Sequence, residues 1–339
     1  MYLNHLHNFR GMAICGIVGA HALQSFDWSG SDASYRIADT LFNESSVWFF
    51  FIAGFLFQYL SPKYKTKKYY IGKIKNVILP YLWLSIPALY VFTLVMPQNS
   101  VPPGFYDHST GMQIVLFLLT GKHLEPFWFV PTITLIYLLA PLLLWLDRRV
   151  WPYLALPPLM VLSAWLGRDG LLIETGLTGM WSPVAKAVYL LSVYCFGMFL
   201  ARFHDRFLRV MPRLWLPLAV MMAAAFAANV EYYDEQVHWM YVFKILACPL
   251  IVYGLHVWDE HVPAKIGLLG SLSFGLFFVH GYVLAAQKVA WSGVLGLPMP
   301  HGNAVSYVLY TAAVLAVCAV LLITVRRICG PQSRMLIGC

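Results

Sequence analysis

The chain has 339 residues, of which 60% are hydrophobic and only 11% are charged. Water-soluble domains average roughly half apolar and a quarter charged residues, so this composition excludes an ordinary soluble protein, and the many aliphatic and aromatic residues exclude intrinsic disorder. A membrane protein with several spans remains. The net charge of +8 is explained by basic cytoplasmic loops, or by basic residues that bind a phosphorylated substrate. We expect no nucleic-acid partner.

About ten apolar runs predict transmembrane helices of about 20 residues each, so the expected fold is all-α and polytopic. In chain order the runs are 9–26, 41–60, 76–96, 127–146, 150–166, 184–201, 214–229, 238–257, 266–287 and 304–325. A shorter run at 112–119 is predicted to be re-entrant or interfacial. With the N terminus in the cytoplasm, most Lys and Arg fall on that side, and an even number of spans places both termini there.

The segments expected outside the cytoplasm mix acidic and histidine side chains with aromatic ones. The longest are 27–40 and 97–126, and 231–235 adds acidic residues beside two tyrosines. This mixture suits contact with a carbohydrate, although solvated loops are often acidic without a ligand. On the opposite side, segment 63–75 carries six lysines. These lysines could set the orientation of the chain and contact anionic lipid, or they could bind a polyanion such as a nucleotide-type donor.

Arg10 and His21 are the first polar residues of interest, because ionisable groups inside a span are costly and mark functional candidates. The two lie 11 positions apart, so they share one face of a helix with a rise of about 16 Å between them. Arg10 would lie at the inner surface, as an anchor or as a ligand for an anion. His21 would lie halfway or more across the membrane, as a buried hydrogen-bonded side chain or as a neutral general base.

Further polar and small residues lie within later spans. The aromatic run 48–55 includes the small pair Ala53-Gly54, which indicates tight packing against a neighbouring helix or a ligand. Ser273 and His280 also share a helix face, but about 10 Å of helix rise separates them, so we expect substrate positioning and not a serine–histidine couple. Lys244 fits snorkelling or an ion pair. The six cysteines form no C-x-x-C pair, and we expect neither disulfides nor a metal site.

The order of these features resembles membrane acyltransferase family 3. Arg10 and His21 are similar to its Arg-x10-His motif, and 49–55 is similar to its second-helix motif. The basic entry to its third helix, a later Trp-Phe segment and a late Ser-to-His helix resemble 70–81, 127–129 and 273–280. There are departures from the family pattern: Ala53 stands where Ser is usual, and Phe274 and Phe277 stand where Tyr is common.

The resemblance implies transfer of an acyl group, often acetyl, from cytoplasmic acyl-CoA to a hydroxyl of a cell-surface or exported polysaccharide. Arg10, helped by Lys73 and Lys75, would bind the CoA phosphates. His21 would activate the hydroxyl or carry the acyl group as an acyl-histidine. The residues expected to contact substrate are Phe51, Gly54, Trp128, Ser273 and His280.

The resemblance also implies a setting. We expect a multi-pass protein of the bacterial inner membrane, with residues 1–339 as one transmembrane domain and no fused extracytoplasmic domain. The expected partners are acyl-CoA, a polysaccharide or lipid-linked glycan, membrane lipid and other glycan-assembly proteins. A transporter or flippase for a glycan or its lipid-linked precursor is the alternative, since several spans with a polar path would also serve transport. A third hypothesis is a sensor or scaffold that has the fold but no catalytic activity.

Overall fold

The apolar runs of the sequence fold into helices. The computed structural model describes residues 3–168, 170, 179–233 and 238–339. These residues contain no β-strand, only a single bridge between Asp27 and His301. A helix satisfies its own backbone hydrogen bonds, which is what a lipid environment requires. The prediction of an all-α, polytopic membrane protein is confirmed.

Each predicted span has a helical counterpart. The helices are α1 (Asn4–Ala22), α2 (Asp32–Phe42), α3 (Ser46–Leu60), α4 (Thr66–Lys73), α5 (Leu79–Tyr90), α6 (Thr110–Thr120), α7 (Phe129–Leu138), α8 (Ala140–Asp147), α9 (Leu156–Leu166), α11 (Ser182–Arg202), α12 (His204–Glu231), α13 (Trp239–Val257), α14 (Ala264–Lys288), α15 (Ala304–Cys329) and α16 (Ser333–Ile337).

Within the described residues, seven helical segments are long and apolar enough to cross a membrane, or eight if one bent pair forms a single span. The predicted run at 150–166 corresponds to a shorter apolar helix, Trp151–Leu166, as does the run predicted to be re-entrant. α1 falls outside the seven because Asn, His and Arg side chains dilute its apolar residues. The count of ten spans and the side on which the termini lie stay predictions.

The bent pair is formed by α7 and α8. The segments Glu125–Leu138 and Ala140–Asp147 meet at an angle of 50°. Pro141 lies directly after the bend, and a proline lacks the N–H that would continue the helical ladder. The predicted span at 127–146 is therefore interrupted by a bend.

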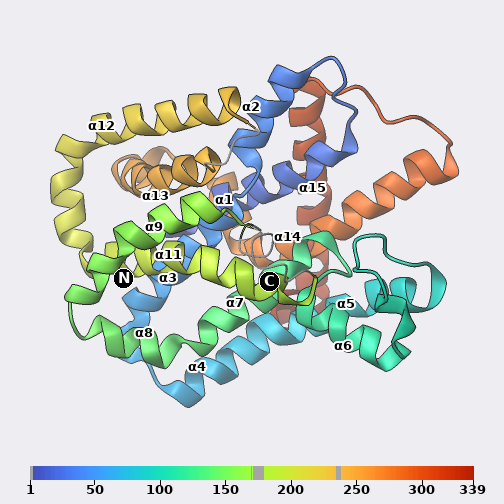
Figure 1. Ribbon diagram of the computed structural model, residues 1–339, viewed down its shortest axis with the longest axis horizontal. Coiled ribbons are helices and arrows are strands. Elements are labelled where there is room, and N and C mark those ends of the chain that lie inside the picture. The colour runs from blue at the N-terminus through green and yellow to red at the C-terminus, as the bar shows by residue number, and fades with distance from the viewer. Residues whose placement is uncertain (1–2, 169, 171–178, 234–237) are drawn as a thin grey trace.

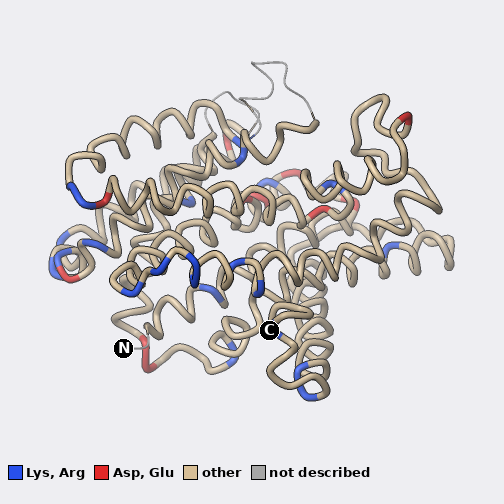
Figure 2. Tube along the Cα trace, turned by 90° about the horizontal axis from the view of Figure 1, so that it is seen from below, with Lys and Arg blue, Asp and Glu red and all other residues tan. Residues whose placement is uncertain are grey.

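Two close helix pairs form the core. α1 packs along α14, and α3 packs along α11, while α12 covers α13 at the edge of the bundle (Figure 1). A Cβ at Gly11 would collide with the carbonyl oxygen of Ile266, so α1 and α14 touch backbone to backbone. Figure 2 shows long stretches of the trace without any charged residue, as a membrane-embedded bundle requires.

Candidate functional site

Two cavities lie at the two ends of α1. The His21 cavity has a volume of about 760 Å³ and is lined by residues that include His21, Glu125 and Trp128. The Arg10 cavity has a volume of about 1070 Å³ and is lined by residues that include Arg10 and Lys73. Among the described residues, no lining residue belongs to both cavities. One helix therefore presents an arginine to one cavity and a histidine to the other.

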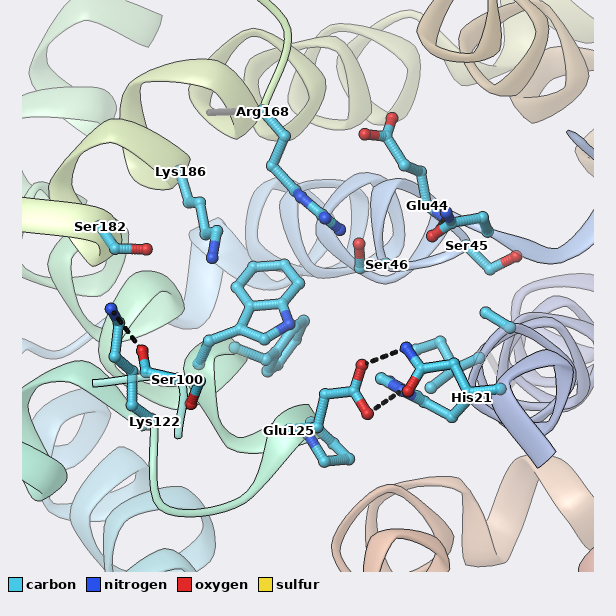
Figure 3. Close-up of a pocket in the computed structure, with 18 of the residues that line it drawn as sticks. His21, Glu44, Ser45, Ser46, Ser100, Lys122, Glu125, Arg168, Ser182 and Lys186 are labelled. Atoms are coloured by element: carbon cyan, nitrogen blue, oxygen red, sulfur yellow. Dashed lines mark hydrogen bonds and ion pairs between the residues drawn. The ribbon is translucent and has the colours of Figure 1, made fainter. Parts of the chain in front are cut away.

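A carboxylate holds the imidazole of His21. The Nδ1 atom of His21 lies 3.5 Å from Oε2 of Glu125 (Figure 3). Gln24 donates a hydrogen bond of 2.7 Å from its Nε2 to the other oxygen of the same carboxylate. A carboxylate at Nδ1 favours the tautomer with a proton there, which leaves Nε2 as a base, and it stabilises the imidazolium that forms when Nε2 accepts a proton.

His280 lies beside His21, with 5.2 Å between the ring centroids. Its Nδ1 is 2.9 Å from the carbonyl oxygen of Leu276. Because a carbonyl only accepts, Nδ1 carries the proton and Nε2 is an unprotonated acceptor. That Nε2 is buried and has no hydrogen-bond partner among the described residues. The two imidazoles, one on α1 and one on α14, thus share one neighbourhood.

The rest of the His21 cavity wall is polar and aromatic. The ammonium of Lys186 lies 4.9 Å from the centroid of the Trp128 ring, and the guanidinium of Arg168 lies 5.9 Å from it. In Figure 3, Lys186 is on the far side of the cavity from His21. Glu44, which accepts a 2.7 Å hydrogen bond from the Tyr189 hydroxyl, has a φ of 53°. A non-glycine residue in that region is held there by its surroundings and often marks a functional site.

The Arg10 cavity is cationic. Arg10 donates a hydrogen bond of 2.9 Å from its guanidinium to the hydroxyl of Ser273. Lys73 places its ammonium 3.8 Å from the centroid of the Tyr137 ring. Its described lining contains no Asp or Glu, and its five cationic residues are Arg10, Lys68, Lys73, Arg326 and Arg334. Such a lining is suited to a ligand that carries several negative charges.

Three predicted site residues lie elsewhere. Lys75 is exposed and lines neither cavity. Phe51 is fully buried against Phe9 and Phe196. A Cβ at Gly54 would collide with the carbonyl oxygen of Tyr194, so Gly54 is a point of close approach between α3 and α11. The geometry therefore gives Phe51 and Gly54 a place in helix packing, because they face α1 and α11 and not a cavity.

The remaining predicted residues lie at or beside the two cavities. Arg10 and Lys73 line one, and His21 and Trp128 line the other. Ser273 and His280 are both fully buried on α14, where Ser273 meets Arg10 and His280 meets His21. As expected, the two are not bonded to each other.

Sequence reasoning missed the role of Glu125, which it treated only as one acid in the outer segment 97–126. The signal was its place directly before the Pro-Phe-Trp stretch that opens α7. Arg326 and Arg334 were considered only for topology, because they follow the last apolar run. In the acidic segment 231–235, residues 234 and 235 lie outside the described residues. No group of three His, Cys, Asp or Glu side chains that would hold a metal ion occurs in the described part of the chain.

Taken together, a histidine with an orienting carboxylate suits proton abstraction from a hydroxyl, and a cationic cavity suits a polyanionic co-substrate. Comparison with known families gives a matching result. A model described as an acyltransferase domain matches residues 3–323. Searches among curated proteins and among solved structures found no match.

Proposed function

The chain belongs to acyltransferase family 3, and from this premise we propose that it is a membrane O-acetyltransferase that uses acetyl-CoA. The proposed acceptor is a hydroxyl of a cell-surface or exported polysaccharide, or of its lipid-linked precursor. The proposed location is the bacterial inner membrane. The observation that carries the proposal is that α1 contributes residues to two separate cavities. Arg10 lies in a cationic cavity, and the His21–Glu125 pair lies in the other.

The donor is assigned to the Arg10 cavity by charge. CoA carries several phosphate charges, and arginine and lysine are the side chains that bind phosphate best. Arg10, Lys73, Arg326 and Arg334 supply such groups from α1, α4, α15 and α16. The hydrogen bond from Arg10 to Ser273 holds the guanidinium against α14.

The acceptor is assigned to the His21 cavity by its mixture of hydrogen-bonding and aromatic groups. Trp128 offers an aromatic surface, and Asn43, Gln98 and Ser100 line the same cavity. Sugar hydroxyls need many donors and acceptors, and sugar C–H faces need an aromatic ring. Other glycan-assembly proteins are the proposed source of the acceptor.

The transfer step follows from the position of the His21 base. Nε2 of His21 takes the proton of the acceptor hydroxyl while the hydroxyl oxygen attacks the thioester carbonyl carbon. The new C–O bond forms, the C–S bond breaks, and the CoA thiolate recovers the proton from His21. Glu125 stabilises the intermediate imidazolium. In a two-step variant Nε2 attacks first, and the acyl group moves from the imidazole to the hydroxyl.

The test uses protein purified in detergent, with acetyl-CoA binding measured by calorimetry and CoA thiol release measured by absorbance. We expect Arg10→Ala and Lys73→Ala to weaken binding, and His21→Ala to keep binding but lose turnover. Lys75→Ala and His261→Ala are matched controls, because both residues are exposed and line neither cavity.

Retained turnover in folded His21→Ala would overturn the role of the base. No interaction of the folded wild type with acetyl-CoA or succinyl-CoA would overturn the acyltransferase reading and favour the glycan transporter. Radiolabel that stays on denatured wild type at neutral pH, is released by acid or hydroxylamine, and is absent from His21→Ala would establish the two-step variant.

A further inference from the structure

Two stacked phenylalanines separate the cavities. Phe274 lines the Arg10 cavity, and Phe277 lines the His21 cavity. They lie about one turn apart on α14, and their rings are stacked with an interplanar angle of 11° and 6.2 Å between centroids. Ser273, the partner of Arg10, and His280, the neighbour of His21, flank the pair on the same helix. The pair is therefore the partition between the two compartments.

Other apolar groups tighten this partition. The Phe129 ring, which also lines the His21 cavity, lies 5.0 Å from the Phe277 ring. The Phe278 ring lies 4.8 Å from the Phe274 ring, and Gly338 packs close against Phe274 from the Arg10 cavity. Phe277 is only 3% exposed. The surface of the partition therefore consists of apolar phenyl rings and carries no charged group.

The proposed function, on which this inference rests, requires a passage here. Arg10 and His21 are separated by about 16 Å of helix rise, so phosphates held at Arg10 and a carbonyl attacked at His21 belong to one extended molecule. The acyl end of that molecule must pass along α14, at the level of Phe274 and Phe277. The thioester stays intact during the passage, and its C–S bond breaks only when the hydroxyl oxygen forms the new C–O bond at His21.

We propose that Phe274 and Phe277 are the specificity-determining residues for the acyl group, and that they select a small uncharged acyl such as acetyl. A carboxylated acyl such as succinyl would lose its hydration between two phenyl rings without gaining a partner. A longer chain would have to displace rings that pack at the density of a protein interior. Both side chains also lack a hydroxyl that would hydrogen-bond a polar acyl group.

The experiment compares acetyl-, butyryl-, octanoyl- and succinyl-CoA as donors. CoA thiol release is measured for wild type, Phe274→Ala and Phe277→Ala, with water and a mixed oligosaccharide pool as acceptors. We expect the butyryl-to-acetyl ratio of kcat/KM to rise about tenfold or more in both variants, the scale of discrimination that a pocket achieves over one or two methylenes. Phe277→Leu, which keeps most of the packing, should shift the ratio less and in the same direction.

Leu272→Ala is the matched control, because Leu272 is buried on the same helix but lines neither cavity. Its ratio should stay within about twofold of wild type, since it leaves the phenylalanine rings in place. An equal shift in Leu272→Ala, or an unchanged ratio in Phe277→Ala and Phe277→Leu, would overturn the inference while leaving the acyltransferase function intact. A folded wild type that is inert to every donor would instead overturn the proposed function, and this inference with it.

Discussion

At the scale of single residues, His21 depends on a partner from a distant segment. Its imidazole lies against Glu125, whose other oxygen is held by Gln24 from the turn after α1. This arrangement makes the carboxylate a positioning group with two functions. It fixes the tautomer of His21, and it supplies negative charge when the imidazole is protonated.

Glu125→Gln should distinguish an effect on the catalytic step from an effect on acetyl-CoA binding. The amide keeps the shape but loses the charge, so we expect kcat to fall about a hundredfold or more, the contribution typical of a general base, while the Kd for acetyl-CoA changes little. Calorimetry and thiol release measure the two quantities. Glu260→Gln is the control, since Glu260 is exposed and lines neither cavity. A parallel loss of donor binding would contradict the assignment.

At the scale of helices, close packing depends on small residues. α3 and α11 approach so closely at Gly54 that a Cβ would meet the Tyr194 carbonyl. Gly54→Ala should therefore lower the free energy of unfolding by about 1–3 kcal/mol, the usual effect of overpacking. Thermal denaturation in detergent measures it. Gly111→Ala on α6 is the control, because its Cβ would enter open space, and an equal loss there would contradict the packing argument.

The connection after α6 is held by a buried histidine. His123 is fully buried, with its Nε2 2.8 Å from the hydroxyl of Ser85 on α5 and its Nδ1 3.1 Å from the carbonyl of Phe117 on α6. Burial lowers the pKa of His123 from 6.5 to about 4. The neutral imidazole thus ties α5 to α6 beside the segment that carries Glu125.

This lowered pKa predicts a pH dependence of stability. Because the unfolded chain binds the proton more readily, the stabilisation is fully present above about pH 6.5 and is lost as the pH falls towards 4. The loss amounts to about 3 kcal/mol for a shift of this size. Thermal denaturation between pH 7 and pH 4 should therefore show a weaker pH dependence for His123→Gln than for wild type. His261→Gln, at an exposed site, should follow wild type; identical curves for all three would contradict the prediction.

The sequence predicts the helices and the Arg10–His21 stripe because both are local properties. Run length identifies a helix, and the period of a helix places residues 10 and 21 on one face. The contact between His21 and Glu125 depends on how α1 and the α7 segment meet, which no local pattern encodes. The same holds for Phe51 and Gly54, since an aromatic run with a small pair looks alike whether it faces a ligand or a neighbouring helix.

At the scale of the whole molecule, the proposed function assigns the donor to the Arg10 cavity and the acceptor to the His21 cavity. Ser271 lines the Arg10 cavity and Ser100 lines the His21 cavity, and both are exposed. In a background without the native cysteines, we expect Ser271→Cys and Ser100→Cys to react with a membrane-impermeant maleimide from opposite faces of sealed vesicles. Ser271→Cys should be labelled from the cytoplasmic face, because the positive-inside rule places the basic segments there. Labelling of both from one face would contradict this topology.

Because α1 is one continuous helix, it also fixes the spacing between the two cavities. A single unbroken helix fixes a rise of about 16 Å between the backbone positions of Arg10, the proposed anchor of the donor phosphates, and His21, the proposed base. In the proposed function, this spacing sets the length of donor that can react, independently of the acyl group. An acyl thioester mounted on a shorter arm would bind at the basic end with its phosphates satisfied, yet its carbonyl would stop short of the imidazole. The length of the donor between its phosphates and its thioester would then determine specificity independently of the acyl group. The number of residues between Arg10 and His21 would set that length.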